Sequence, residues 1–176
     1  MIEKTQLRMI WRHLVWQLIA AVLFVTVVLF ALGAVAKSAL IWAVGAGALS
    51  SSACLVFSAP NSSVSKPSQI FGGYVIGLSV GLLMHILLTT VLADMVLMHS
   101  VIGAGTHVFW ACASVAVGVT MLLLVLLGFG HPPAVGVSLV LVLDIRHYTI
   151  VWVILFCAFL LAIIRWLFGR YLVNLL

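Results

Sequence analysis

Charge is the property that this sequence has least of. Only 6% of its 176 residues are Asp, Glu, Lys or Arg, whereas 66% are hydrophobic. An average soluble domain is about a quarter charged and roughly half apolar. A water-soluble fold of this size could not bury so much apolar surface. The sequence therefore predicts an all-α, polytopic transmembrane helix bundle whose surroundings are a lipid bilayer.

Groups that would bind nucleic acid or a metal ion are also scarce. The net charge is +5, but the cations are scattered over several hydrophobic boundaries and form no basic stripe, so no nucleic-acid partner is expected. Cys54, Cys112 and Cys157 each lie inside an apolar run without a C-x-x-C spacing. The histidines inside apolar runs include no i, i+4 pair and have no carboxylate nearby to complete a site. We expect no metal and no cofactor.

An enzymatic activity is not expected either. An intramembrane hydrolase or transferase needs a nucleophile, a base and an orienting group placed together. The serines at 50–52 and His131 could supply the first two of these, but the sequence offers no evident third member. The prediction is a membrane protein that is not an enzyme.

Apolar runs divide the chain into six candidate crossings. Charged residues and stretches rich in Gly, Pro, Asn or Ser separate these runs, which cover residues 14–36, 39–59, 70–92, 101–127, 132–143 and 148–168. About 20 apolar residues cross a bilayer core of about 30 Å, so about six spans fill the chain. The fifth run is too short, because its 12 residues reach only about 18 Å as a helix.

The positions of the cations predict an orientation. If all six runs cross, both termini lie on the same side of the membrane. Six cations then lie on that side, namely Lys4, Arg8, Arg12, Lys66, Arg165 and Arg170. Only Lys37 and Arg146 lie on the other side, together with Asp94 and Asp144. The positive-inside rule therefore places the N- and C-termini in the cytoplasm, in what we expect to be a bacterial inner membrane.

Two of the six runs have a composition that a continuous lipid-facing helix does not need. Gly45 and Gly47 lead into three serines in the second run, and a Gly-Phe-Gly-His-Pro-Pro stretch precedes the fifth. These runs hold equivalent places in two three-helix halves, 1–94 and 95–176, of one transmembrane domain. Because each half has an odd number of crossings, the halves must be inverted relative to one another. We expect the second and fifth segments to be broken or re-entrant, as in transporters whose substrate site lies at the membrane midplane.

A substrate site is predicted where the two breaks meet. It comprises small and polar residues of both segments: Ser50, Ser51, Ser52, His131, Pro132, Pro133 and Ala134. Consecutive prolines mark the start of a helix, whose free N–H groups and positive dipole end favour an anion. Serine hydroxyls and one imidazole add donors without a permanent charge, which also suits a neutral polar solute. His85 and His107 lie inside other apolar runs and are candidates for proton coupling.

A glycine stripe in the third run supports an alternative function. Gly73, Gly77 and Gly81 form a G-x-x-x-G-x-x-x-G pattern, which puts three positions without side chains on one helix face. Such a face lets a neighbouring helix approach closely, either within the chain or in a homo-oligomer. The alternative is therefore a small structural or accessory membrane subunit that packs against a partner through this face.

Two blocks of the sequence resemble the HPP family of small integral membrane proteins. Gly-His-Pro-Pro-Ala at 130–134 is similar to the family signature, and residues 51–60 and 66–74 are similar to its other block. That block typically has a basic turn before Gly-Gly-His, whereas here Lys66 precedes the proline and Tyr74 takes the place of the histidine. The resemblance implies a membrane transporter. Because members of the family have been linked to nitrite uptake, it implies nitrite, a small monovalent anion, as the substrate.

Overall fold

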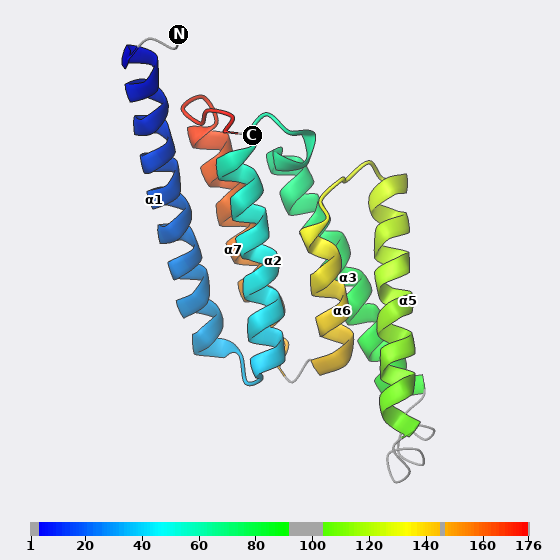
Figure 1. The fold of residues 1–176 in the computed structure, drawn as a ribbon. Coiled ribbons are helices and arrows are strands. Elements are labelled where there is room, and N and C mark those ends of the chain that lie inside the picture. Colours follow the sequence, from blue (N-terminus) through cyan, green and yellow to red (C-terminus); the bar gives the residue numbers. More distant parts are fainter. Residues whose placement is uncertain (1–3, 92–103, 145–146, 176) are drawn as a thin grey trace.

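The computed structural model describes residues 4–91, 104–144 and 147–175, and throughout these ranges the regular structure is helical. The elements are α1 (Lys4–Val35), α2 (Ala39–Ser58), the short 3-10 helix η1 (Ser63–Ser65), α3 (Pro67–Val91), α5 (Ala104–Leu126), α6 (Pro133–Asp144) and α7 (Thr149–Phe168). The helices lie side by side in one bundle, and the N- and C-termini are at the same end of it (Figure 1). The expected all-α bundle is confirmed.

Five of the described helices, α1, α2, α3, α5 and α7, are long and apolar enough to cross a membrane. The sixth, α6, has only 12 residues. It begins part of the way down the bundle and ends at the face opposite to the termini, where α7 starts back (Figure 1). The fifth crossing is therefore made by the non-helical chain that leads from α5 together with the short helix. The chain is an integral membrane protein.

Successive helices alternate in direction, so that α1, α2 and α3 run opposite to α5, α6 and α7, respectively (Figure 1). The packed pairs also correspond: α1 packs on α2 as α5 packs on α6, and α3 packs on α6 as α7 packs on α2. This is the arrangement that inverted three-helix halves produce. The predicted boundary between the halves, at residues 94 and 95, lies outside the described residues, as do Asp94 and Arg146.

The second segment differs from its prediction, because α2 is one continuous helix from Ala39 to Ser58. The hydroxyl of Ser51 donates to the carbonyl of Ala48 at 2.9 Å, and that of Ser52 lies 3.0 Å from the same carbonyl, so the serines do not interrupt the helix. Gly45 lies against side chains of neighbouring helices instead of interrupting the helix. The expectation of a broken second segment was wrong, whereas the fifth segment is shortened.

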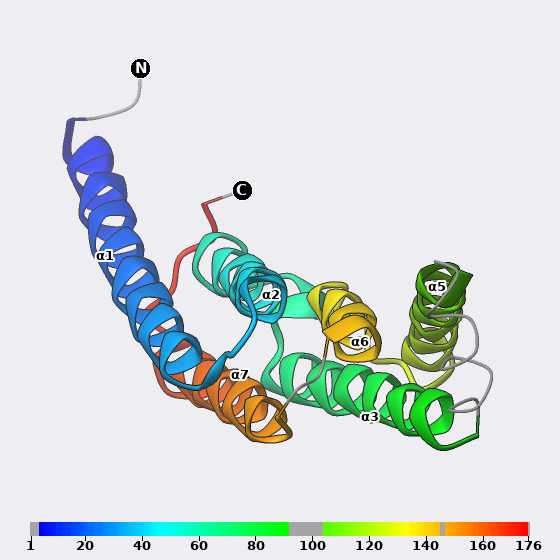
Figure 2. The ribbon, with the colours of Figure 1, turned by 90° about the horizontal axis from the view of Figure 1, so that it is seen from below.

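The α6 helix is covered on several sides. It packs most extensively on α3 and also on α5 and α2, while α7 lies on the far side of α3 from α5 (Figure 2). Val137, Val140 and Leu141 of α6 are fully buried. At the start of this half-helix Ala134 is also buried, whereas Pro132 just before it is exposed.

The glycine stripe of α3 provides the surface on which α6 packs. A Cβ atom added at Gly73 would lie 2.7 Å from Cβ of His131, and one at Gly81 would lie 2.8 Å from the carbonyl oxygen of Ser138. At Gly77 the carbonyl oxygen of Ala134 is closer still. The glycines therefore serve packing within the chain. The alternative function was an accessory subunit that docks on a partner through the glycine face. The docking surface was predicted wrongly, because α6 of the same chain already covers that face.

Candidate functional site

Three polar side chains from different segments meet at the start of α6. Ser52 comes from the second half of α2, Tyr74 from the first half of α3, and His131 from the chain just before α6, and all three are 0% exposed. The Ser52 hydroxyl lies 2.9 Å from the Tyr74 hydroxyl and 2.8 Å from Nε2 of His131. We call these three residues the polar cluster.

A backbone carbonyl fixes the protonation pattern of the imidazole. Nδ1 of His131 lies 3.0 Å from the carbonyl oxygen of Val64, in η1. A carbonyl only accepts hydrogen bonds, so Nδ1 carries a proton and donates it to Val64. When the imidazole is neutral, Nε2 is bare and accepts from the Ser52 hydroxyl, which in turn accepts from Tyr74. Each of these polar hydrogens then has an acceptor.

The same atoms also satisfy a protonated imidazole. With a proton on Nε2, His131 donates to Ser52, and the Ser52 hydroxyl turns to the carbonyl of Ala48, 3.0 Å away in the previous turn of α2. Tyr74 keeps donating to the second lone pair of the Ser52 oxygen. The polar cluster therefore offers a hydrogen-bond partner to each ring nitrogen of His131 in either protonation state, with no movement of heavy atoms.

The start of α6 offers fewer free donors than expected. Pro132 and Pro133 have no N–H, while the N–H of Ala134 donates to His131 at 3.2 Å and that of Val135 donates to Pro132 at 3.0 Å. These tight turns satisfy the first amides that a bare helix start would present. The expectation of free N–H groups at Ala134 was wrong, so donors to a bound solute would come from side chains of the polar cluster.

The other predicted site residues lie apart from the polar cluster. Ser51 is exposed and bonds only its own helix among the described contacts, and Ser50 is half-buried. His85 lies 11 residues beyond Tyr74, about 16 Å along α3, with its imidazole at the backbone of Val142. The exposed His107 stacks edge-on against Trp110 with ring centroids 5.0 Å apart. Of the three serines, only Ser52 meets His131.

Two residues of the site were missed in the sequence. Tyr74 was noted only as a departure from the family pattern, yet it contributes a hydroxyl to the polar cluster. Gln69 holds the loop before α6, because its amide donates to the carbonyl of Gly128 at 2.9 Å and its side-chain oxygen accepts from the N–H of Gly130. The signal for both was their position: Gln69 precedes and Tyr74 follows Gly72-Gly73, where the chain around His131 approaches α3.

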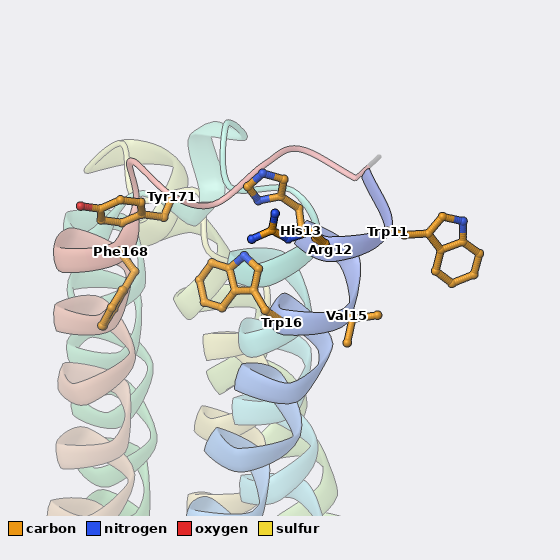
Figure 3. A pocket seen from close by; sticks show the side chains of 7 residues that line it. All are labelled: Trp11, Arg12, His13, Val15, Trp16, Phe168 and Tyr171. Carbon is orange, nitrogen blue, oxygen red and sulfur yellow. The ribbon is translucent and has the colours of Figure 1, made fainter. Parts of the chain in front are cut away.

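The polar cluster is fully buried, and a large groove lies elsewhere among the described residues. A groove of about 1050 Å³ opens between the N-terminal part of α1 and the end of α7 (Figure 3). Within the described residues no group of three or more His, Cys, Asp or Glu side chains is placed to hold a metal ion.

Comparison with known proteins gives one match. A family model described as "HPP, transmembrane region" matches residues 6–175, nearly the whole chain. No curated protein and no solved structure matches the chain.

Proposed function

Because the chain belongs to the HPP transmembrane family, we propose that it is a transporter or channel-like protein for a small monovalent anion, with nitrite as the candidate. The observation that carries this proposal is the polar cluster of Ser52, Tyr74 and His131, fully buried in a bundle whose buried side chains are mostly apolar. Ionisable groups at membrane depth are costly, and they mark solute pathways more often than they serve packing.

The chemistry of the polar cluster suits an anion that must also leave. A bare anion in an apolar medium is strongly disfavoured unless donors replace its water. The two hydroxyls can each turn a hydrogen toward such a solute, and the imidazole can donate one from Nε2 when it is protonated. No Lys or Arg is among them, so the anion would be held without a permanent countercharge and could be released. A small neutral polar solute would use the same donors and is the second candidate.

Access to the site requires a rearrangement around α6. The chain before α6 contains Gly128, whose φ of +73° few other residues adopt without strain, and Gly130. The amide of Gln69 bonds this loop at both glycines. We propose that the loop and the half-helix move against α2 and α3 to expose the polar cluster first to one side and then to the other.

A serine next to a histidine is also part of a catalytic triad, but the group on the other side of this histidine argues against an enzyme. In a triad a carboxylate behind the imidazole stabilises its charged form. Here the group behind His131 is the carbonyl of Val64, which carries no full charge. We therefore propose transport in place of catalysis. Labelling of Ser52 by a fluorophosphonate, a probe for activated serines, would contradict this choice.

The orientation is part of the proposal. Arg12, Lys66, Arg165 and Arg170 lie toward the end of the bundle that holds both termini, whereas Lys37 lies in the turn at the opposite end. By the positive-inside rule the termini then face the cytoplasm, in a bacterial inner membrane.

The test is anion flux into liposomes that contain the purified protein. Nitrite, formate and nitrate are supplied in parallel, with protein-free liposomes as the blank. We expect nitrite to enter faster than in the blank and the entry to be lost in Ser52→Ala, with Ser51→Ala as the matched control on the same helix. Absence of flux for all three anions would refute anion transport and leave the neutral solute.

A further inference from the structure

The groove between α1 and α7 has features that the proposed transport function does not use. The N-terminal end of α1 lies well away from the rest of the bundle, whereas its C-terminal end adjoins α7 and α2 (Figure 2). Where the two helices diverge, the upper groove is lined mainly by α1 residues and by Phe168 and Tyr171 of the α7 end (Figure 3). An opening of this kind within a bilayer must be filled, because apolar walls leave no place for water.

The groove continues downward as an apolar slot. The upper groove and a second cavity of about 310 Å³ share Trp16 and Phe168 as lining residues, so they adjoin. The second cavity is walled by Ala20 and Val27 of α1 and reaches Phe57 of α2. Its lining is entirely apolar.

The length of the combined groove corresponds to one leaflet of a membrane. From Arg12 to Val27 is 15 residues of helix, or about 22 Å. A whole bilayer with its headgroups is about 40–45 Å thick, so one leaflet takes about half of that. A transmembrane helix of a partner would instead need a groove along the full length of α1.

The mouth of the groove carries positive charge and hydrogen-bond donors. Arg12 and His13 extend into the space beside Trp16 (Figure 3). Nδ1 of His13 is buried and has no hydrogen-bond partner among the described residues. Tyr171 stands across the mouth on the α7 side (Figure 3), and tyrosines are enriched where membrane proteins meet lipid headgroups. A phosphate at this point would pair with the guanidinium and supply an acceptor to the imidazole.

We propose that this groove is a binding site for one anionic phospholipid of the leaflet on the side of the termini. An acyl chain occupies the apolar slot between Trp16 and Val27, and the phosphate group lies at Arg12 and His13. Basic pockets between transmembrane helices recognise acidic lipid headgroups in this way. The site does not depend on the transport function and is separate from the polar cluster.

Native mass spectrometry of the purified full-length protein tests the proposal. The protein is exchanged into detergent with equal amounts of phosphatidylglycerol and phosphatidylcholine that carry the same acyl chains. We expect one phosphatidylglycerol to be retained per chain in preference to phosphatidylcholine. Arg12→Gln should weaken its retention by about five-fold, the effect of one basic residue at a membrane surface. Arg170→Gln removes an exposed cation near the same end that does not line the groove and should leave retention unchanged.

A second variant probes the apolar slot and does not depend on charge. Ala20→Phe places a ring inside the slot, where it should lower the retention of both lipids, while thermal unfolding in lipid-free detergent shows that the variant is folded. Equal retention of the two lipids by the unaltered protein would overturn the headgroup assignment. A lipid-free dimer that loses its stability in Ala20→Phe would overturn the proposal and assign the groove to a second copy of the chain.

Discussion

Ser52 and His131 are 79 positions apart in the chain, yet the serine hydroxyl lies 2.8 Å from Nε2 of the imidazole. This contact joins a continuous helix of the first half to the start of the half-helix of the second. Both side chains are fully buried. Since an unpaired polar group inside a membrane protein is costly, the contact ties the position of the α6 start to α2.

Ser52→Ala should therefore affect both stability and transport. It leaves Nε2 of His131 and the hydroxyl of Tyr74 without their shared partner. Hydrogen bonds between transmembrane helices average about 0.6 kcal/mol and reach about 1.7 kcal/mol, so losing two should cost about 1–2 kcal/mol. Unfolding of the purified protein in detergent measures this cost, and liposome flux measures the loss of transport.

Ser51→Ala is the control for this substitution. Ser51 lies next to Ser52 on the same helix, but it is exposed and its hydroxyl bonds the helix backbone at 2.9 Å. We expect wild-type stability and wild-type flux. If Ser51→Ala impaired flux as strongly as Ser52→Ala, the polar cluster would not be the transport site.

Substitutions at Tyr74 distinguish the contribution of its hydroxyl from that of its ring. Tyr74→Phe removes one donor but leaves Ser52 bonded to His131, so it should cost less stability than Ser52→Ala, about 0.5–1 kcal/mol. Tyr74→His restores the residue type that the family pattern has here and also supplies a donor toward Ser52. We expect Tyr74→His to retain more flux than Tyr74→Phe in the liposome assay. Equal flux in the two variants would show that no donor is needed at this position.

Composition and hydropathy were sufficient to predict where most of the described helices lie, although α1 begins at Lys4 and not at residue 14, and α2 is not broken. The fifth run was predicted at 132–143, and α6 covers Pro133–Asp144. The scarcity of charge and the lengths of the apolar runs lead to this prediction. Backbone N–H and C=O groups in lipid must be hydrogen-bonded within the chain, and helices achieve this. The shortness of the fifth segment could also be predicted from the sequence, since two prolines mark the start of its helix.

The details of the site could not be predicted from local sequence. Three successive serines suggested a break, but a helix can satisfy a serine hydroxyl with its own carbonyls, as Ala48 does for Ser51. Which serine meets His131, and that Tyr74 joins them, depends on the rotation of α2 and α3 about their axes. For α3, that rotation is set by the contact of Gly73 and Gly77 with the α6 start, which is a property of the folded chain.

Gly77→Ala should separate α3 from α6. The added Cβ would press on the backbone carbonyl of Ala134, which cannot turn aside as a flexible side chain can. Overpacking of this kind costs about 1–3 kcal/mol. Gly118→Ala on α5 is the matched control, because a Cβ there would meet no atom within 4 Å. Thermal unfolding in detergent should show a lowered midpoint for Gly77→Ala alone, and a tolerated Gly77→Ala would refute the close packing of α3 on α6.

Proton coupling is the prediction that follows most directly from the two hydrogen-bonding patterns of the polar cluster. A protonated His131 is positive and can pair with the anion, so one proton and one anion would cross the membrane together without net charge. Protonation becomes more complete as the pH falls, so nitrite uptake should rise when the outside of the liposomes is acidified. An internal pH reporter should record acidification together with uptake.

His131→Gln is the variant that tests this coupling. A glutamine can still donate to Val64 and contact Ser52, but it cannot take up a proton. Any nitrite flux that remains should be independent of external pH, after subtraction of the protein-free blank that accounts for permeation of the undissociated acid. Retention of the full pH response in His131→Gln would assign the coupling to another residue. His85, which lies in the membrane-spanning helix α3, would be the next residue to substitute.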